Sequence, residues 1–284
     1  MRRSSLDIGF SPCPNDTFMF HALVHGIVVL PGMEVRPVLA DIDELNRRAA
    51  GDRPLPVTKL SVGAIAGVAD RYAILDAGAA LGHGVGPLIV ARQRADAPGD
   101  LRGLAGRRVA IPGERTTANL LLGLFGPSGI ERVAMGFDGI LAAVATGEVD
   151  AGVIIHESRF SYAEHGLVAI ADLGAVWEQE SGLPLPLGVI AVSRGLPQRE
   201  VAALEHALRA SVRAAFADPT ASAAYVRAHS QELSDSVCAQ HIALYVNEFS
   251  TSLGARGRAA IDELTARGRE RGILPDSGSP WQQI

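Results

Sequence analysis

One stretch of the sequence ends an apolar segment abruptly in residues that can do acid–base chemistry. Ala151–Ile155 is typical of a buried strand, and the polar segment His156–Arg159 follows it directly. Buried parallel strands place such residues at the mouth of a cleft, and histidine is the usual base near neutral pH. A lone histidine is more often structural, but this position favours a catalytic role for His156. Arg159 can bind a carboxylate or pair with Glu157 in a structural salt bridge.

A second polar segment, Thr58-Lys59-Leu60-Ser61, ends another predicted strand. Hydroxyl groups and an ammonium group at the carboxyl end of a strand suit a carboxylate or polyol ligand. The alternative is that Ser61 caps the next helix and that Lys59 is exposed. We include all four residues among the candidate ligand contacts.

A third segment, Gly113–Thr117, precedes a predicted helix. The hydroxyls of Thr116 and Thr117, with the free N–H groups of the helix start, suit a carboxylate or phosphate. The segment lacks the Gly-Lys-Ser/Thr ending of a P-loop. Simple helix capping by the two threonines is the alternative.

A fourth segment, Ser11–Thr17, lies between a predicted strand and a predicted helix and contains two prolines. Asn15 or Asp16 can cap this helix, and the N–H groups at its start can hold an anion. A helix start without a ligand is the alternative. Cys13 stands nearby without a base close in sequence, so we expect a buried structural thiol rather than a nucleophile.

The sequence predicts neither a metal nor a cofactor. His21 and His25 have the i, i+4 spacing of a zinc site, but Ala22 occupies the position of the glutamate in the H-E-x-x-H pattern. The glycines of Gly82–Gly86 have the wrong spacing for a dinucleotide fingerprint. They can form a turn, a hinge or a close approach to a ligand.

The composition is that of a folded globular protein without nucleic-acid or membrane signals. The chain has 284 residues, 48% of them hydrophobic and 20% charged, with a formal net charge of −5. There is no basic block for nucleic acid and no apolar run long enough to cross a bilayer. The two cysteines match no metal or redox spacing, and Met1-Arg2-Arg3 is not followed by the apolar run of a signal peptide. We therefore expect a cytoplasmic protein. Its oligomeric state, monomer or homodimer, stays open.

Short strands alternate with helices along most of the chain, which predicts an α/β fold with mostly parallel sheets and helices on both faces. The expected strands are Leu6–Phe10, Met33–Leu39, Leu55–Leu60, Tyr72–Leu75, Pro87–Ala91, Arg108–Ile111, Arg132–Met135, Ala151–Ile155, Val168–Asp172 and Leu187–Val192. The expected helices are Thr17–His25, Asp41–Ala50, Val62–Ala69, Thr117–Phe125, Asp138–Ala145, Pro197–Ala217, Pro219–His229, Ser234–Phe249 and Ala255–Arg271.

A break in this pattern at Arg92–Gly106 indicates two lobes. We expect residues 1–92 and 190–284 to form one discontinuous lobe, with its C-terminal helices, and residues 93–189 to form an inserted second lobe. Two chain crossings, near 92–100 and 185–192, would form the hinge. This is the plan of a two-lobed, type II periplasmic-binding-protein-like fold with a central ligand cleft.

Six motifs, in this order and spacing, closely resemble the 1,4-dihydroxy-6-naphthoate synthase family of the futalosine route to menaquinone. They are S-P-C-P-N-D-T-F, T-K-L-S, G-x-G-V-G-P-L, T-T-A-N, H-E-S-R-F and G-L-P-L-P-L-G. The resemblance implies a cofactor-independent carbon–carbon lyase that converts cyclic dehypoxanthine futalosine to 1,4-dihydroxy-6-naphthoate. It also implies His156 as proton acceptor and substrate contacts at Thr58–Ser61, Thr116 and Thr117. Asn15, Asp16 and Arg159 are our own additions to this site.

Two other functions are compatible with such a fold, since fold alone does not determine function. One is a non-catalytic solute-binding protein, which the missing export signal and the base at the cleft mouth disfavour. The other is the related chorismate dehydratase, which the H-E-S-R and T-K-L-S motifs disfavour. In each case the expected partner is a small-molecule carboxylate rather than a nucleic acid or a membrane.

Overall fold

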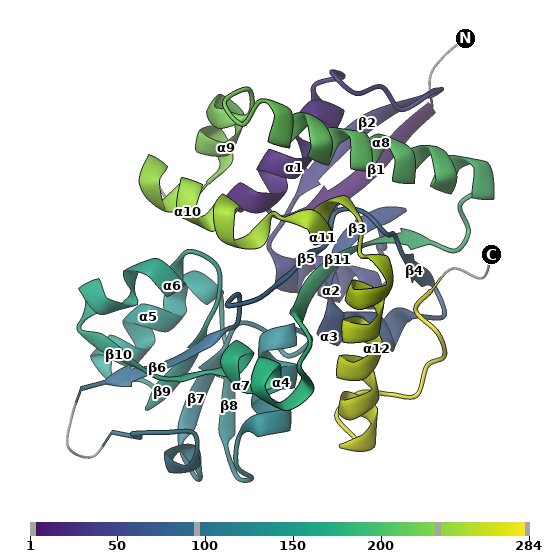
Figure 1. Ribbon diagram of the computed structural model, residues 1–284. Helices are drawn as coiled ribbons and strands as arrows, with labels where there is room; N and C mark the ends of the chain where they lie inside the picture. Colours follow the sequence, from purple (N-terminus) through teal and green to yellow (C-terminus); the bar gives the residue numbers. More distant parts are fainter. Residues whose placement is uncertain (1–3, 94–96, 231–233, 282–284) are drawn as a thin grey trace.

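The computed structural model describes residues 4–93, 97–230 and 234–281, which form two β-sheets surrounded by helices (Figure 1). The first sheet has the strand order β2-β1-β3-β11-β4, and β5 pairs with β11 beyond this path. Its strands are β1 (Ser4–Phe10), β2 (Met33–Leu39), β3 (Val57–Ser61), β4 (Tyr72–Ile74), β5 (Ala80–Gly82) and β11 (Leu185–Ser193). The second sheet has the order β10-β6-β9-β7-β8. Its strands are β6 (Leu88–Arg92), β7 (Arg108–Ile111), β8 (Glu131–Ala134), β9 (Ala151–Ile154) and β10 (Leu167–Asp172).

Both sheets are mixed, which corrects the expectation of mostly parallel pairing. β1 runs parallel to β2 and β3, and β7 runs parallel to β8 and β9. β11 is antiparallel to β3, β4 and β5, and β6 is antiparallel to β9 and β10. The reason is the two crossings: β6 carries the chain into the second sheet and β11 carries it back, and both run against their neighbours. The carboxyl ends of β1, β3, β7 and β9 still carry the polar segments that the sequence singles out.

The exact boundaries of the two lobes stay a proposal, but the membership of β6 in the second sheet moves the first boundary. β6 precedes residue 93 and nevertheless pairs with β9 and β10 in the second sheet. We therefore place this crossing at 83–87, between β5 and β6. Figure 1 shows the return along β11, beside β5, between the two bodies of the molecule.

Helices of both parts of the chain cover the sheets. On the first sheet α1 (Pro14–Val24) packs against α8 (Gln198–Ala217), α9 (Ala223–His229) and α10 (Asp235–Tyr245). The other helices of this part are α2 (Ile42–Ala50), α3 (Val62–Ile65), η1 (Ala66–Val68), α11 (Glu248–Thr251) and α12 (Gly254–Glu270). The second sheet carries η2 (Arg102–Leu104), α4 (Thr117–Phe125), α5 (Phe137–Thr146), α6 (Ser158–Ser161), η3 (Tyr162–His165) and α7 (Leu173–Ser181).

Besides the short 3-10 turns η2 and η3, three elements are missing from the prediction: α6, α7 and β5. The helix α7 has clear local signals, because Asp172 accepts hydrogen bonds from the N–H groups of Gly174 and Ala175, and Gly182 ends the helix at φ 68°. These are an N-cap and a left-handed C-terminal glycine. The three-residue β5 has no such signal, since it is a strand only because β11 pairs with it.

Two of the expected helices are divided in the structure. The segment expected as one helix at Ser234–Phe249 is two, α10 and α11, and Val62–Ala69 continues beyond α3 as a 3-10 turn. No helix among the described residues is long and apolar enough to span a membrane. Residues 1–3 and 94–96, which belong to the expectations about export and about the break, lie outside the described residues.

Candidate active site

A cavity lies where the polar strand ends of the two sheets meet. It is lined by six of the residues that the sequence singles out: Asn15, Lys59, Ser61, Thr116, Thr117 and His156. Apolar residues such as Ile42, Val85 and Leu187 form most of the remaining wall. A cavity with apolar walls and a few convergent polar groups is typical of a small-molecule site.

His156 follows β9 and has an unusual backbone. Its φ is 55°, and it is the one non-glycine residue with a positive φ within the described ranges. A non-glycine residue in this left-handed region costs about 1–3 kcal/mol, and such strain concentrates at functional sites. The turn points the imidazole back into the cavity, where the edge of the ring contacts Phe137 at a centroid distance of 4.9 Å.

The two nitrogens of His156 have different surroundings. Nδ1 lies 3.5 Å from Sγ of Cys13. Nε2 is buried and has no hydrogen-bond partner in the part of the chain that the structure describes. A buried polar atom without a partner is costly unless a ligand supplies one. Nε2 is thus the nitrogen available to a molecule in the cavity.

Burial lowers the pKa of His156 to about 4, and the positive charge of Lys59 acts in the same direction while Asp16 opposes it. The imidazole is therefore neutral at neutral pH, as a proton acceptor must be. Burial also raises the pKa of Cys13, and the negative charge of Glu157 adds to this effect. Cys13 is therefore a neutral thiol. It is buried, as expected, and it also contacts the imidazole of His156.

Lys59 and Asp16 form a buried ion pair between β3 and α1. The side chain of Lys59 is 6% exposed and that of Asp16 is fully buried. Asp16 also accepts two hydrogen bonds from Ser11, one from the N–H at 3.0 Å and one from the hydroxyl at 2.6 Å. A further hydrogen bond comes from Nδ2 of Asn15 at 3.0 Å. The expectation that Asn15 or Asp16 caps the helix is wrong, because Cys13 is the N-cap residue and makes no side-chain cap. Asp16 instead lies behind the cavity wall and holds Lys59 in place.

The strand β3 divides the Thr58–Ser61 motif between two faces, because successive side chains of a strand point to opposite sides. Lys59 and Ser61 line the cavity. Thr58 and Leu60 are buried away from it, with Leu60 in the apolar core. Ser61 does not cap the next helix; its hydroxyl accepts a hydrogen bond from Nδ2 of Asn46 at 2.9 Å.

The hydroxyls of Thr116 and Thr117 line the cavity but already have protein partners. Thr116 caps α4 by accepting a hydrogen bond from the N–H of Asn119 at 3.2 Å. Thr117 donates to the carbonyl of Leu187 at 2.7 Å and accepts from the N–H of Gly63 at 3.1 Å. These bonds join the start of α4 to β11 and α3, so the threonines fix the geometry where the two sheets meet.

Arg159 does not reach the cavity lining. Its guanidinium donates to the carbonyl of Gly86 and pairs with Asp172 at 3.1 Å. The sequence offered a structural salt bridge as the alternative role of Arg159. The structure has such a salt bridge, but its partner is Asp172 rather than Glu157. Gly86 itself packs backbone to backbone on α7: an added Cβ would lie 2.3 Å from Cα of Gly174. One glycine of the Gly82–Gly86 segment thus allows a close approach, as one expectation had it, but the approach is to the backbone of Gly174 rather than to a ligand.

The C-terminal helix α10 contributes two cavity residues that sequence reasoning missed, His241 and Tyr245. His241 is buried, with 1% of its surface exposed. Its Nε2 lies 3.1 Å from Oδ1 of Asn15, and its ring stacks near His156 at 6.2 Å. Burial lowers the pKa of His241 and raises that of Tyr245. The i, i+4 spacing of the pair was a signal that they share a helix face, but not that this face closes the cavity.

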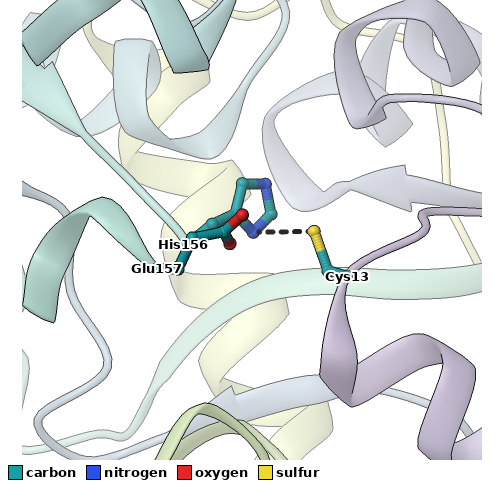
Figure 2. A group of neighbouring side chains, drawn as sticks. All are labelled: Cys13, His156 and Glu157. Atoms are coloured by element: carbon teal, nitrogen blue, oxygen red, sulfur yellow. Dashed lines mark hydrogen bonds between the residues drawn. The ribbon is translucent and has the colours of Figure 1, made fainter. Parts of the chain in front are cut away.

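Figure 2 shows Cys13, His156 and Glu157 together, although Cys13 comes from the turn after β1 and the other two from the turn after β9. One ligand atom of each lies within 4.8 Å of the others, and no second group of this kind occurs among the described residues. His21 and His25 are not part of such a group; their rings lie 4.4 Å apart at a tilt of 37°, and Nδ1 of His25 hydrogen-bonds to the carbonyl of His21.

Comparisons with known proteins identify the family of this chain. A family model described as menaquinone biosynthesis matches residues 6–270. The 1,4-dihydroxy-6-naphthoate synthase of Thermus thermophilus is 51% identical over 97% of this chain and 98% of its own. A crystal structure of an Archaeoglobus fulgidus protein has a TM-score of 0.88 at 36% identity, covering 95% of this chain and 98% of that one.

The alkanesulfonate-binding protein SsuA of Xanthomonas axonopodis pv. citri shares the fold, with a TM-score of 0.70 at 17% identity over 97% of this chain and 96% of its own. The two-lobed, type II periplasmic-binding-protein-like fold expected from the sequence is thereby confirmed. The match to the family model and the identity to the Thermus enzyme extend over nearly the whole chain. The chain belongs to the menaquinone-biosynthesis family that includes the 1,4-dihydroxy-6-naphthoate synthases.

Proposed function

We propose that this enzyme of menaquinone biosynthesis is a carbon–carbon lyase that converts cyclic dehypoxanthine futalosine to 1,4-dihydroxy-6-naphthoate, with His156 as proton acceptor. The observation that carries the proposal is the unpartnered Nε2 of His156 at a largely apolar cavity. A neutral imidazole is held there by a strained backbone, and its Nε2 has no hydrogen bond to give up, so this nitrogen is prepared to accept a proton from a bound molecule.

In this reaction His156 removes a proton from carbon, a carbon–carbon bond breaks, and the ring becomes aromatic as a sugar-derived fragment leaves. Such a step also needs a donor for the oxygen on which negative charge develops. Lys59 is the charged donor in the cavity wall, and the N–H groups at the start of α4 are further donors. Either can alternatively bind the carboxylate of the substrate.

The contact between Cys13 and His156 supports a defined orientation of the ring. With Nδ1–H pointing at Sγ, the lone pair of Nε2 points into the cavity. Because Cys13 and His156 follow strands of different sheets, this orientation depends on the cleft being closed. Closure would also exclude water from the site.

The test is turnover of the purified protein with cyclic dehypoxanthine futalosine, followed by the absorbance of the aromatic product. For His156→Asn we expect turnover to fall by about two to four powers of ten while substrate binding is retained. Asparagine tolerates the left-handed backbone at this position. His206→Asn, an exposed change in α8, is the matched control. Near-normal turnover of His156→Asn would refute the role.

Chorismate serves as the second substrate in the same assay. Loss of its enol-pyruvyl group, without turnover of the futalosine derivative, would assign the dehydratase function instead. Binding of either compound without any product would assign a solute-binding role.

A further inference from the structure

We propose that Cys13, His156 and Glu157 form a binding site for a thiophilic divalent cation such as Zn²⁺, and that the bound ion competes with substrate. The three side chains supply one sulfur, one nitrogen and one oxygen ligand, a set that zinc accepts. The competition between metal and substrate rests on the proposed role of His156 in turnover, whereas the binding of the metal does not.

The spacing of sulfur and nitrogen already fits the ion. With bonds of about 2.3 Å to sulfur and about 2.0–2.1 Å to nitrogen, a tetrahedral zinc ion separates these two ligands by about 3.5 Å. Sγ of Cys13 and Nδ1 of His156 are 3.5 Å apart. A carboxylate oxygen of Glu157 lies within 4.8 Å of this sulfur and of a ring nitrogen of His156, and needs to approach by about 1 Å, which rotation of its side chain allows.

Charge balance favours the occupied state in an apolar cavity. Binding displaces the thiol proton of Cys13, since the thiolate is the metal ligand. One thiolate and one carboxylate then neutralise the two positive charges of the ion, so no net charge is buried. The nearby ammonium of Lys59 is already paired with Asp16.

Occupation would disable the base and hold the cleft closed. A metal on Nδ1 leaves the proton of the neutral imidazole on Nε2, which is the nitrogen that faces the cavity without a partner. That nitrogen can then no longer accept a proton. The ion would also join the turn after β1 to the turn after β9, and thereby hold the two sheets together at the cavity.

The binding test uses Co²⁺ and Zn²⁺ alone with the purified full chain. We expect one equivalent of Co²⁺ to give the intense d–d bands of a tetrahedral site and a thiolate-to-cobalt charge-transfer band, which Zn²⁺ abolishes. Cys13→Ser should lose the charge-transfer band and bind Zn²⁺ more weakly by over ~100-fold, the upper range for changes outside the ligand set. Cys238→Ser, which removes the other buried thiol, is the matched control and should bind like the parent.

Glu157→Gln provides a second variant that keeps the thiol. It should retain the charge-transfer band and bind Zn²⁺ more weakly than the parent. Absence of the cobalt bands in the parent protein, or their survival in Cys13→Ser, would overturn the site. Thermal unfolding of each variant shows whether it is folded.

The competition test adds Zn²⁺ to the turnover assay. We expect inhibition that EDTA reverses and that rising substrate overcomes. Inhibition that is independent of substrate concentration, or none at the concentration that saturates the cobalt site, would overturn the competition. If the protein binds Co²⁺ through Cys13 but has no turnover, the metal site stands and the proposed function is refuted. If the protein has turnover but binds no metal, the proposed function stands and the metal site is refuted.

Discussion

Acidification should destabilise the folded protein through His156, and the effect can be calculated from its pKa. In the folded chain this pKa is lowered to about 4, from an ordinary value near 6.5. Between these two values the unfolded chain binds a proton that the folded chain does not bind. The free energy of unfolding therefore falls as the pH drops from about 6.5 to about 4, and is unaffected by this group above that range.

The size of the effect follows from the shift. One pKa unit corresponds to about 1.4 kcal/mol, so the full loss is about 3 kcal/mol. Of this, about 2 kcal/mol is lost between pH 7 and pH 5. This is a large fraction of the stability of a typical domain, which is about 5–15 kcal/mol. His241, whose pKa is also lowered by burial, acts in the same direction.

The measurement is urea unfolding at pH 7 and pH 5 for the parent chain, His156→Asn and His206→Asn. Other titrating groups contribute equally to all three, so the comparison isolates His156. We expect the loss of stability on acidification to be smaller by about 2 kcal/mol in His156→Asn, and unchanged in the exposed control. Equal losses in all three proteins would refute the assignment of a buried, neutral imidazole.

Four further substitutions, one of them a rescue, test the surroundings of the site. Asp16→Asn leaves the buried ammonium of Lys59 unpaired and should destabilise the protein by about 3–5 kcal/mol in urea unfolding, whereas adding Lys59→Met should restore most of this loss. Gly86→Ala puts a methyl group 2.3 Å from Cα of Gly174 and should lower the stability by at least about 1–3 kcal/mol; an unchanged Tm would contradict this packing. Arg159→Met should reduce stability without changing KM, because the guanidinium lies outside the cavity lining. A rise in KM of about tenfold would mean that it binds the substrate carboxylate after all.

The strand ends that carry the site could be predicted because their signals are local. An apolar run that stops at His156, and the threonine pair before α4, are visible in a few residues each. The alternation of β3 could also have divided its motif, since only Lys59 and Ser61 share a face. The prediction takes all four residues of the motif as contacts, and Leu60 is wrong because it lies in the core.

The surroundings of each candidate could not be predicted because they depend on residues distant in the chain. Arg159 forms a salt bridge with Asp172 and a hydrogen bond to the carbonyl of Gly86. Asp16 is the buried ion-pair partner of Lys59 and not a helix cap. Packing of these groups decides which polar atoms are satisfied and which stay open to a ligand.

The sequence by itself determined the class of fold, the family and the residues at the ends of the strands, because backbone periodicity and short motifs are properties of neighbouring residues. Only the tertiary structure decided that His156 lies beside Cys13 and near His241, and that its Nε2 is left without a partner. The physical reason is that desolvation and contact depend on which faces of distant elements pack together. The low pKa of the imidazole, and the chemistry built on it, come from that packing.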